Sequence, residues 1–142
     1  MRTNHVTARP GLLAVFLAVQ LLGGCQTLAE KRQSTRLEKA LHAYELIMRW
    51  GDLGNIDQFA LASDTAQSSE ILENADKIRV THYEVLSGPV AIDADTVMQQ
   101  VLIRYIVRDT QVQKELLDRQ VWRYVPEQKT WKRISKPPRF AL

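Results

Sequence analysis

The segment Thr96–Arg108, TVMQQVLIRYIVR, decides the fold of this chain. Most of its large apolar residues are separated by an even number of positions, and they are Val97, Val101, Ile103, Tyr105 and Val107. Successive side chains of a β-strand point to opposite faces, so these residues share one face. The segment therefore predicts a strand with one face buried in a core.

Three further segments have the composition of strands. Lys77–Ser87 precedes the first segment, and Gln113–Val125 and Thr130–Ser135 follow it. The links between the four segments are short, namely residues 88–95, 109–111 and 126–129. Because a parallel crossover needs a dozen or more residues, these short links predict a four-stranded antiparallel sheet made of hairpins.

The half of the chain before the strands carries helix signals. Thr35-Arg36-Leu37-Glu38 fits a capping box that begins a helix. One apolar stripe follows at helical spacing, formed by Leu37, Ala40, Leu41, Tyr44, Ile47 and Met48. Gly51 is placed to end this helix, and Asp52 to cap a shorter one through about Ala62. We expect an α+β fold, with N-terminal helices packed on a curved four-stranded antiparallel sheet.

The N-terminus has the layout of a secretory signal. Arg2 and Arg9 precede the apolar run Gly11–Leu22, which leads into Leu22-Gly23-Gly24-Cys25. This run resembles the lipobox of bacterial lipoproteins, which implies cleavage between Gly24 and Cys25 and acyl chains, such as palmitate, on Cys25. Gln26, rather than Asp, follows the cysteine. By the same resemblance we expect the outer membrane, facing the periplasm, rather than the inner one. An ordinary signal peptide or an uncleaved anchor is the alternative.

These signals divide the chain into three parts. Residues 1–24 form the predicted signal peptide, residues 25–34 the lipidated cysteine with a short polar tether, and residues 35–142 a single α+β domain. Loss of the two signal arginines leaves basic and acidic side chains nearly balanced, so we expect no nucleic-acid partner. Basic residues still gather near the C-terminus, at Arg119, Arg123, Lys129, Lys132, Arg133, Lys136 and Arg139. They either meet phosphates of lipids or lipopolysaccharide, or are solvated faces of strands.

The order of these elements resembles a known superfamily. A helix carrying Tyr44-Glu45 ends in Arg49-Trp50-Gly51-Asp52, and the last hairpin carries Gln120-Val121-Trp122-Arg123-Tyr124 and Thr130-Trp131-Lys132. This pattern is similar to the nuclear transport factor 2-like (cystatin-like cone) superfamily, and to small proteobacterial lipoproteins within it. The resemblance implies helices lying over a cone-like sheet.

The superfamily includes ketosteroid isomerases and polyketide cyclases, so an active site has to be considered. In the isomerases an Asp base works with a Tyr and a protonated Asp in an apolar cone. The candidates here are Tyr44, Glu84, Tyr105 and Asp118. We interpret the two carboxylates as members of surface ion pairs, which are commoner, and we predict no enzyme. His42 and His82 lack the spacing of a metal site, so we expect neither a metal nor a cofactor.

The large aromatic residues have two interpretations. Tyr44, Trp50, Trp122 and Trp131 either line a ligand pocket or fill a core, and we favour the core for each tryptophan. Phe140 either folds back onto the domain or is presented to a partner. The prediction is a lipid-anchored envelope lipoprotein that binds an envelope protein or an apolar small molecule. The alternatives are an isomerase- or cyclase-like enzyme, and a module that docks on lipopolysaccharide or peptidoglycan through its basic C-terminal strands.

Overall fold

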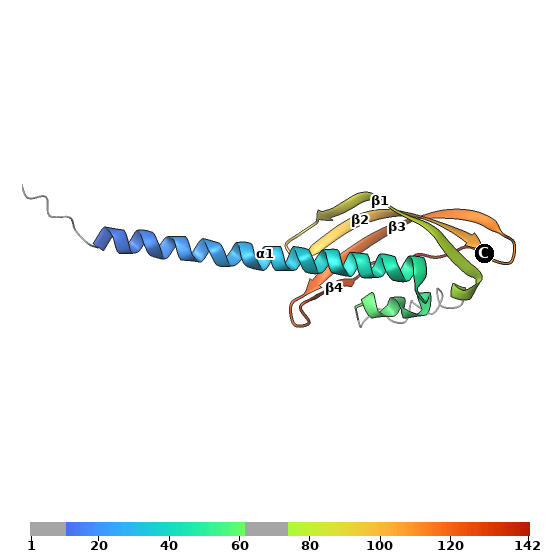
Figure 1. The fold of residues 1–142 in the computed structure, drawn as a ribbon, viewed down its shortest axis with the longest axis horizontal. Coiled ribbons are helices and arrows are strands. Elements are labelled where there is room, and N and C mark those ends of the chain that lie inside the picture. Colours follow the sequence, from blue (N-terminus) through green and yellow to red (C-terminus); the bar gives the residue numbers. More distant parts are fainter. Residues whose placement is uncertain (1–10, 62–73) are drawn as a thin grey trace, which may run out of the picture. The chain divides into compact units, whose positions relative to one another are not determined.

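A computed structural model describes residues 11–61 and 74–142, with side chains from residue 28 onward. The chain forms two compact units, Met1–Thr35 and Arg36–Leu142. Helix α1 (Gly11–Trp50) begins in the first unit and ends in the second (Figure 1). Arg2 and Arg9, part of the predicted signal peptide, lie outside the described residues.

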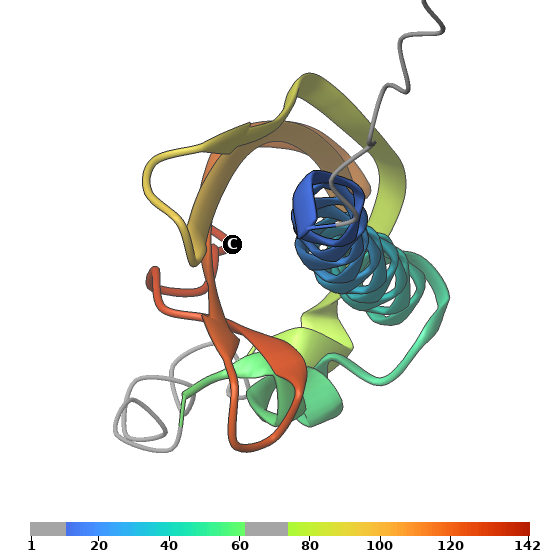
Figure 2. The same cartoon turned by 90° about the vertical axis from the view of Figure 1, so that its left-hand side faces the viewer.

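The second unit is a helix packed against a four-stranded antiparallel sheet, which confirms the α+β class. The strands are β1 (Ile78–Ala91), β2 (Thr96–Val107), β3 (Val112–Val125) and β4 (Thr130–Arg133). They lie in sequence order, and each pairs antiparallel with the next. Figure 2 shows that the sheet is curved and does not close on itself. The curvature leaves a concave face on which the core forms.

Strand β2 has the predicted alternation from Val97 to Val107, whereas Thr96 before it is buried as well. Its inward residues include Val101 and Ile103, both fully buried, and Tyr105. Strand β1 is longer than predicted, because it continues past Gly88 and Pro89 to Ala91. This strand is at the edge of the sheet, where a proline costs no ladder hydrogen bond on the open side. A register shift between Ser87 and Val90 accommodates the two residues.

The predicted start of the helix at Thr35 is wrong. Residue 35 lies inside α1, and its hydroxyl donates to the carbonyl oxygen of Lys31 at 3.0 Å. A threonine hydroxyl can be satisfied in this way by the preceding turn, so it need not act as a cap. Residues 26–34 contain neither Gly nor Pro to stop a helix, and they are helical rather than an extended tether.

The end of α1 follows the sequence signals more closely. The helix ends at Trp50, directly before Gly51. The side chain of Asp52 then caps the next element by accepting a hydrogen bond from the backbone N–H two residues later, at 2.8 Å. That element is η1 (Leu53–Phe59), a 3-10 helix. It ends at Phe59 and is shorter than the predicted helix. The predicted end near Ala62 lies outside the described residues, and a second short turn, η3 (Ala75–Lys77), precedes β1.

The core lies between α1, η1 and the concave face of the sheet. Three rings meet edge to face at its centre, with Tyr44 5.3 Å from Phe59 and 5.4 Å from Trp122 between ring centroids. Phe140 folds back onto the domain, where its ring contacts Tyr105 edge to face at 5.0 Å. The C-terminal segment therefore closes the core instead of presenting Phe140 to a partner.

Candidate functional site

A charged pair lies in the interior, between the sheet and α1. The guanidinium of Arg133, on β4, forms two hydrogen bonds with the carboxylate of Asp118, on β3, at 2.6 and 3.0 Å. Arg133 is 4% exposed and Asp118 is 3% exposed. Burial of a charge is costly unless it is paired and hydrogen-bonded, and here both conditions hold.

The remaining donors of Arg133 are also engaged. Its Nη1 donates to the hydroxyl of Tyr44 on α1, and its Nη2 to the carbonyl oxygen of Lys136 at 2.6 Å. Its Nε donates to the hydroxyl of Ser135 at 3.0 Å. A guanidinium has five N–H donors, and all five have protein partners. Arg133 therefore connects β3, α1 and the C-terminal segment, and has no donor left for a ligand.

Gln120 extends this network across the sheet. Its amide nitrogen donates to Asp118 at 2.8 Å and to the hydroxyl of Tyr83 at 2.9 Å. Its amide oxygen accepts from Gln99 at 2.8 Å and from the indole of Trp122 at 3.2 Å. Two donor and two acceptor positions are therefore filled, which fixes the orientation of this side chain.

The electrostatics of the network favour a static arrangement. Burial raises the pKa of Tyr44 and of Tyr83 well above the usual value of a phenol, so both remain neutral at ordinary pH. Burial alone would lower the pKa of Arg133, but the facing Tyr44 and Asp118 raise it, so the guanidinium keeps its charge. Neither phenol is poised to take up or release a proton near neutral pH.

The four candidate catalytic residues are only partly brought together. Tyr44 and Asp118 both bind Arg133 in the core. Glu84 is about half exposed on β1 and pairs with His82 at 3.4 Å, as expected of a surface carboxylate. Tyr105 is buried, but its hydroxyl is bonded to the backbone N–H and carbonyl of Ala141. The interpretation of Asp118 as part of a surface ion pair is wrong, because the pair is buried.

The key partner in this network was missed from the sequence. Arg133 was grouped with the basic residues of the C-terminal strands, yet it is buried. A usable signal was present, since Trp131 and Arg133 are two positions apart and so share a face of β4. Because Trp131 is a core residue, Arg133 on the same face faces the core as well.

The aromatic residues differ in position. Trp122 and Trp131 are in the core, with 0% and 4% exposure. The core position favoured for Trp50 is wrong, because this side chain is 74% exposed. Trp50 lies two residues after Met48 at the end of α1, and it therefore points away from the buried stripe. The guanidinium of Arg49 lies 5.0 Å from its ring centroid, which is a cation–π contact.

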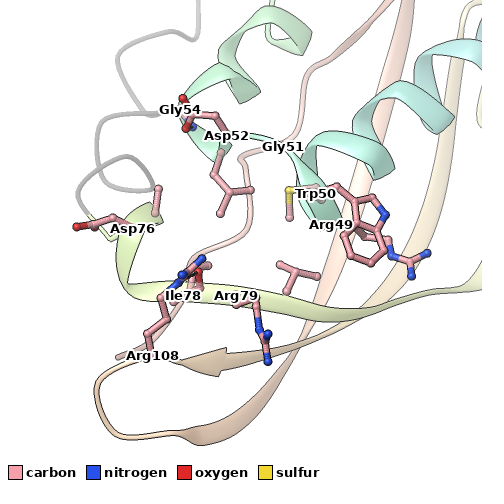
Figure 3. Close-up of a pocket in the computed structure, with 13 residues that line it drawn as sticks. Arg49, Trp50, Gly51, Asp52, Gly54, Asp76, Ile78, Arg79 and Arg108 are labelled. Carbon is pink, nitrogen blue, oxygen red and sulfur yellow. Dashed lines mark hydrogen bonds between the residues drawn. The ribbon is translucent and has the colours of Figure 1, made fainter.

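An open pocket of about 510 Å³ lies beside Trp50, between the end of α1, η1 and the start of β1 (Figure 3). Apolar residues line part of it, namely Met48, Leu53, Ile78 and Val80. Charged side chains line the rest, namely Arg49, Asp52, Asp76, Arg79 and Arg108. The lining of the pocket is therefore mixed, with apolar side chains beside charges of both signs.

A second exposed apolar surface lies near the turn between β1 and β2. It is formed by Val85, Leu86, Val90 and Ile92, each between 47% and 57% exposed. Pro89 interrupts the free edge of β1 in the middle of this surface. A proline at an edge opposes pairing with another strand, so this surface is a weaker candidate for a partner than the pocket beside Trp50.

The predicted lipidation and cleavage positions, Gly24 and Cys25, lie within α1 by their backbone. Lipidation and cleavage remain predictions. Among the described residues, no helix is long and apolar enough to span a membrane. In the same part of the chain, no three His, Cys, Asp or Glu side chains are grouped so as to hold a metal ion.

No family model matches this chain, and no curated protein or solved structure matches it.

Proposed function

We propose that this chain is a lipid-anchored protein of the bacterial cell envelope whose domain binds a partner protein. The anchor is Cys25, which follows the basic and apolar segments of a signal peptide and is the only cysteine of the chain. Two or more acyl chains hold a protein firmly on a bilayer, whereas one does so only marginally. We further propose that the anchor lies in the outer membrane. We also propose that the domain is cone-like, which the order of elements and the curvature of the sheet support.

The observation that carries the binding role is the filled interior. An isomerase-like site needs a carboxylate that can take up a proton inside an apolar cone. Asp118 instead holds Arg133 through two hydrogen bonds, and all five donors of that arginine are engaged. The polar interior therefore serves to hold the elements together, which leaves the surface as the place of recognition.

The surface that we propose for the partner is the pocket beside Trp50. Exposed tryptophan and arginine side chains are the residue types that contribute most to protein–protein interfaces. Trp50 contacts Arg49 and lines a pocket whose lining is partly apolar. The pocket is open rather than enclosed, which suits a protein surface better than a small molecule, since such ligands are usually mostly buried.

The anchor is tested by the mass of the protein extracted from envelopes with mild detergent. We expect the mass of residues 25–142 plus acyl chains, and Cys25→Ser should abolish this product. An unmodified mature chain or an unprocessed full-length chain would refute the lipoprotein assignment.

The partner site is tested by photo-crosslinking in intact cells. A photoreactive amino acid at position 50 should give a discrete protein adduct, and Arg79→Ala in the same pocket should weaken it. The matched control is position 90, an exposed apolar residue on the other surface. Equal adducts at positions 50 and 90, or an adduct at position 90 alone, would contradict the assignment of the partner to this pocket.

A further inference from the structure

A second groove, distinct from the pocket beside Trp50, is lined by positive charge. It has a volume of about 390 Å³ and lies between residues 36–43 of α1, the end of η1 and the β3–β4 hairpin. Its lining includes four basic residues and no acidic one: Arg36, Lys39, Lys129 and Lys132. Phe59 and Trp131 contribute rings to the same groove. Four cations around one concavity produce a local positive potential that favours an anion.

These charges are not neutralised within the described part of the chain. None of the four basic residues forms a salt bridge with another described residue, whereas Arg104 and Arg49 elsewhere on the surface do. Glu38 and Glu127 are close in sequence to the groove lysines, but they do not line the groove. The four charges are therefore available to an anion from outside the chain.

Two of the cations are held in position by hydrogen bonds that leave donors free. Arg36 donates from Nη1 to the hydroxyl of Tyr124 at 2.8 Å. Lys132 donates from Nζ to the carbonyl oxygen of Gln58 at 2.6 Å. An ammonium has three donors and a guanidinium five, so both side chains keep capacity for a second acceptor. Their positions are therefore set before any ligand binds, which lowers the entropic cost of binding.

The position of the groove along the chain indicates the source of the anion. Arg36 is eleven residues after Cys25, a distance of about 17 Å along a helix and about 40 Å in a fully extended chain. If Cys25 is acylated, the groove cannot be far from the bilayer surface. We propose that this groove binds the phosphate of anionic lipid headgroups and so orients the domain on the membrane. Of the steps in this proposal, only the position of the groove near the bilayer depends on the lipid anchor.

The test measures binding of the full chain carrying Cys25→Ser to lipid vesicles. Without acyl chains, the outcome does not depend on whether the anchor assignment is right. Vesicles of phosphatidylcholine alone are compared with vesicles that also contain phosphatidylglycerol, so that any contribution of the apolar N-terminal segment is common to both. We expect tighter binding to the anionic vesicles. The double variant Lys39→Gln and Lys129→Gln should lose about thirtyfold of that binding, and Lys39→Gln alone about fivefold.

The matched control removes the same charge from positions that do not line the groove. Lys77 in η3 and Arg119 on β3 are both absent from its lining, and Lys77→Gln with Arg119→Gln should change binding by less than about threefold, because screening weakens the contribution of charges away from the groove. Circular dichroism melting establishes that each variant is folded. Equal losses in both double variants, or no preference of the parent chain for anionic vesicles, would overturn the proposal. Release by inorganic phosphate at constant ionic strength would identify a free-phosphate site instead, and would also overturn it.

Discussion

Replacement of Arg133 by methionine tests whether the buried ion pair holds the domain together. The variant keeps most of the side-chain length but leaves the carboxylate of Asp118, only 3% exposed, without its counter-ion. Removal of one partner of a buried pair costs about 3–5 kcal/mol. Since a domain of this size is stable by about 5–15 kcal/mol, the variant should lose about a fifth or more of its stability.

The assay is urea denaturation of the full chain with Cys25→Ser, followed by circular dichroism, because the free energy of unfolding is linear in urea concentration. The control is Arg104→Met, which breaks the exposed pair with Glu115 at 3.5 Å. Surface pairs contribute about 0–1 kcal/mol, so this change should be nearly neutral. A loss below about 1 kcal/mol for Arg133→Met would refute the reasoning, since it would mean that water or relaxation solvates the carboxylate.

A double variant separates the cost of an orphaned charge from the net contribution of the pair. Arg133→Met with Asp118→Leu removes both charges, and apolar replacement of a buried pair is often neutral. Here Tyr44, Gln120 and Ser135 also lose partners, so we expect recovery of about half of the single-variant loss. Two single losses that simply add in the double variant would show that the two residues act independently.

Three further predictions follow from other parts of the domain. The raised pKa values of Tyr44 and Tyr83 mean that the folded chain keeps two protons that the unfolded chain loses above about pH 10. The free energy of unfolding should therefore keep its full value below that pH and fall above it by about 1.4 kcal/mol per pH unit for each tyrosine. Tyr83→Phe should halve this slope, as measured by urea denaturation. Gly51→Ala should cost about 1–3 kcal/mol, because its Cβ would lie 2.9 Å from the Cα atom four residues earlier, whereas Gly88→Ala, with nothing within 4 Å, should be nearly neutral in the same assay. Phe140→Ala should cost about 3–5 kcal/mol in thermal or urea unfolding if the C-terminal segment closes the core, and an unchanged midpoint would show that the segment is dispensable.

The strands were predictable because their signal is local. The alternation in 96–107 depends only on the period of a strand, and β2 begins at Thr96 as expected. The end of α1 before Gly51 and the cap at Asp52 are equally local signals. The start of the helix was not predictable from Thr35, since the same hydroxyl can either cap a helix or bond to the preceding turn.

The candidate site was predictable only in pieces. Tyr44 was placed on the buried stripe, and Asp118 was recognised as a carboxylate within the predicted strand Gln113–Val125. Trp50 was misplaced because a tryptophan at a helix end is equally compatible with a core position and an exposed one. The composition of the C-terminal strands did not separate the buried Arg133 from Lys129 and Lys132, which line an open groove, and only the spacing of Arg133 from Trp131 offered a signal.

By itself, the sequence determined the types of element, most of their limits and the antiparallel order, since periodicity, caps and short links act between near neighbours. Only the tertiary structure decided which charges are buried. The pairing of β3 with β4 places Arg133 opposite Trp122, on the face that also carries Asp118. There the loss of hydration is offset by a partner fifteen residues away in the sequence. No local pattern contains that compensation, because it arises when the sheet and helix exclude water from both groups at once.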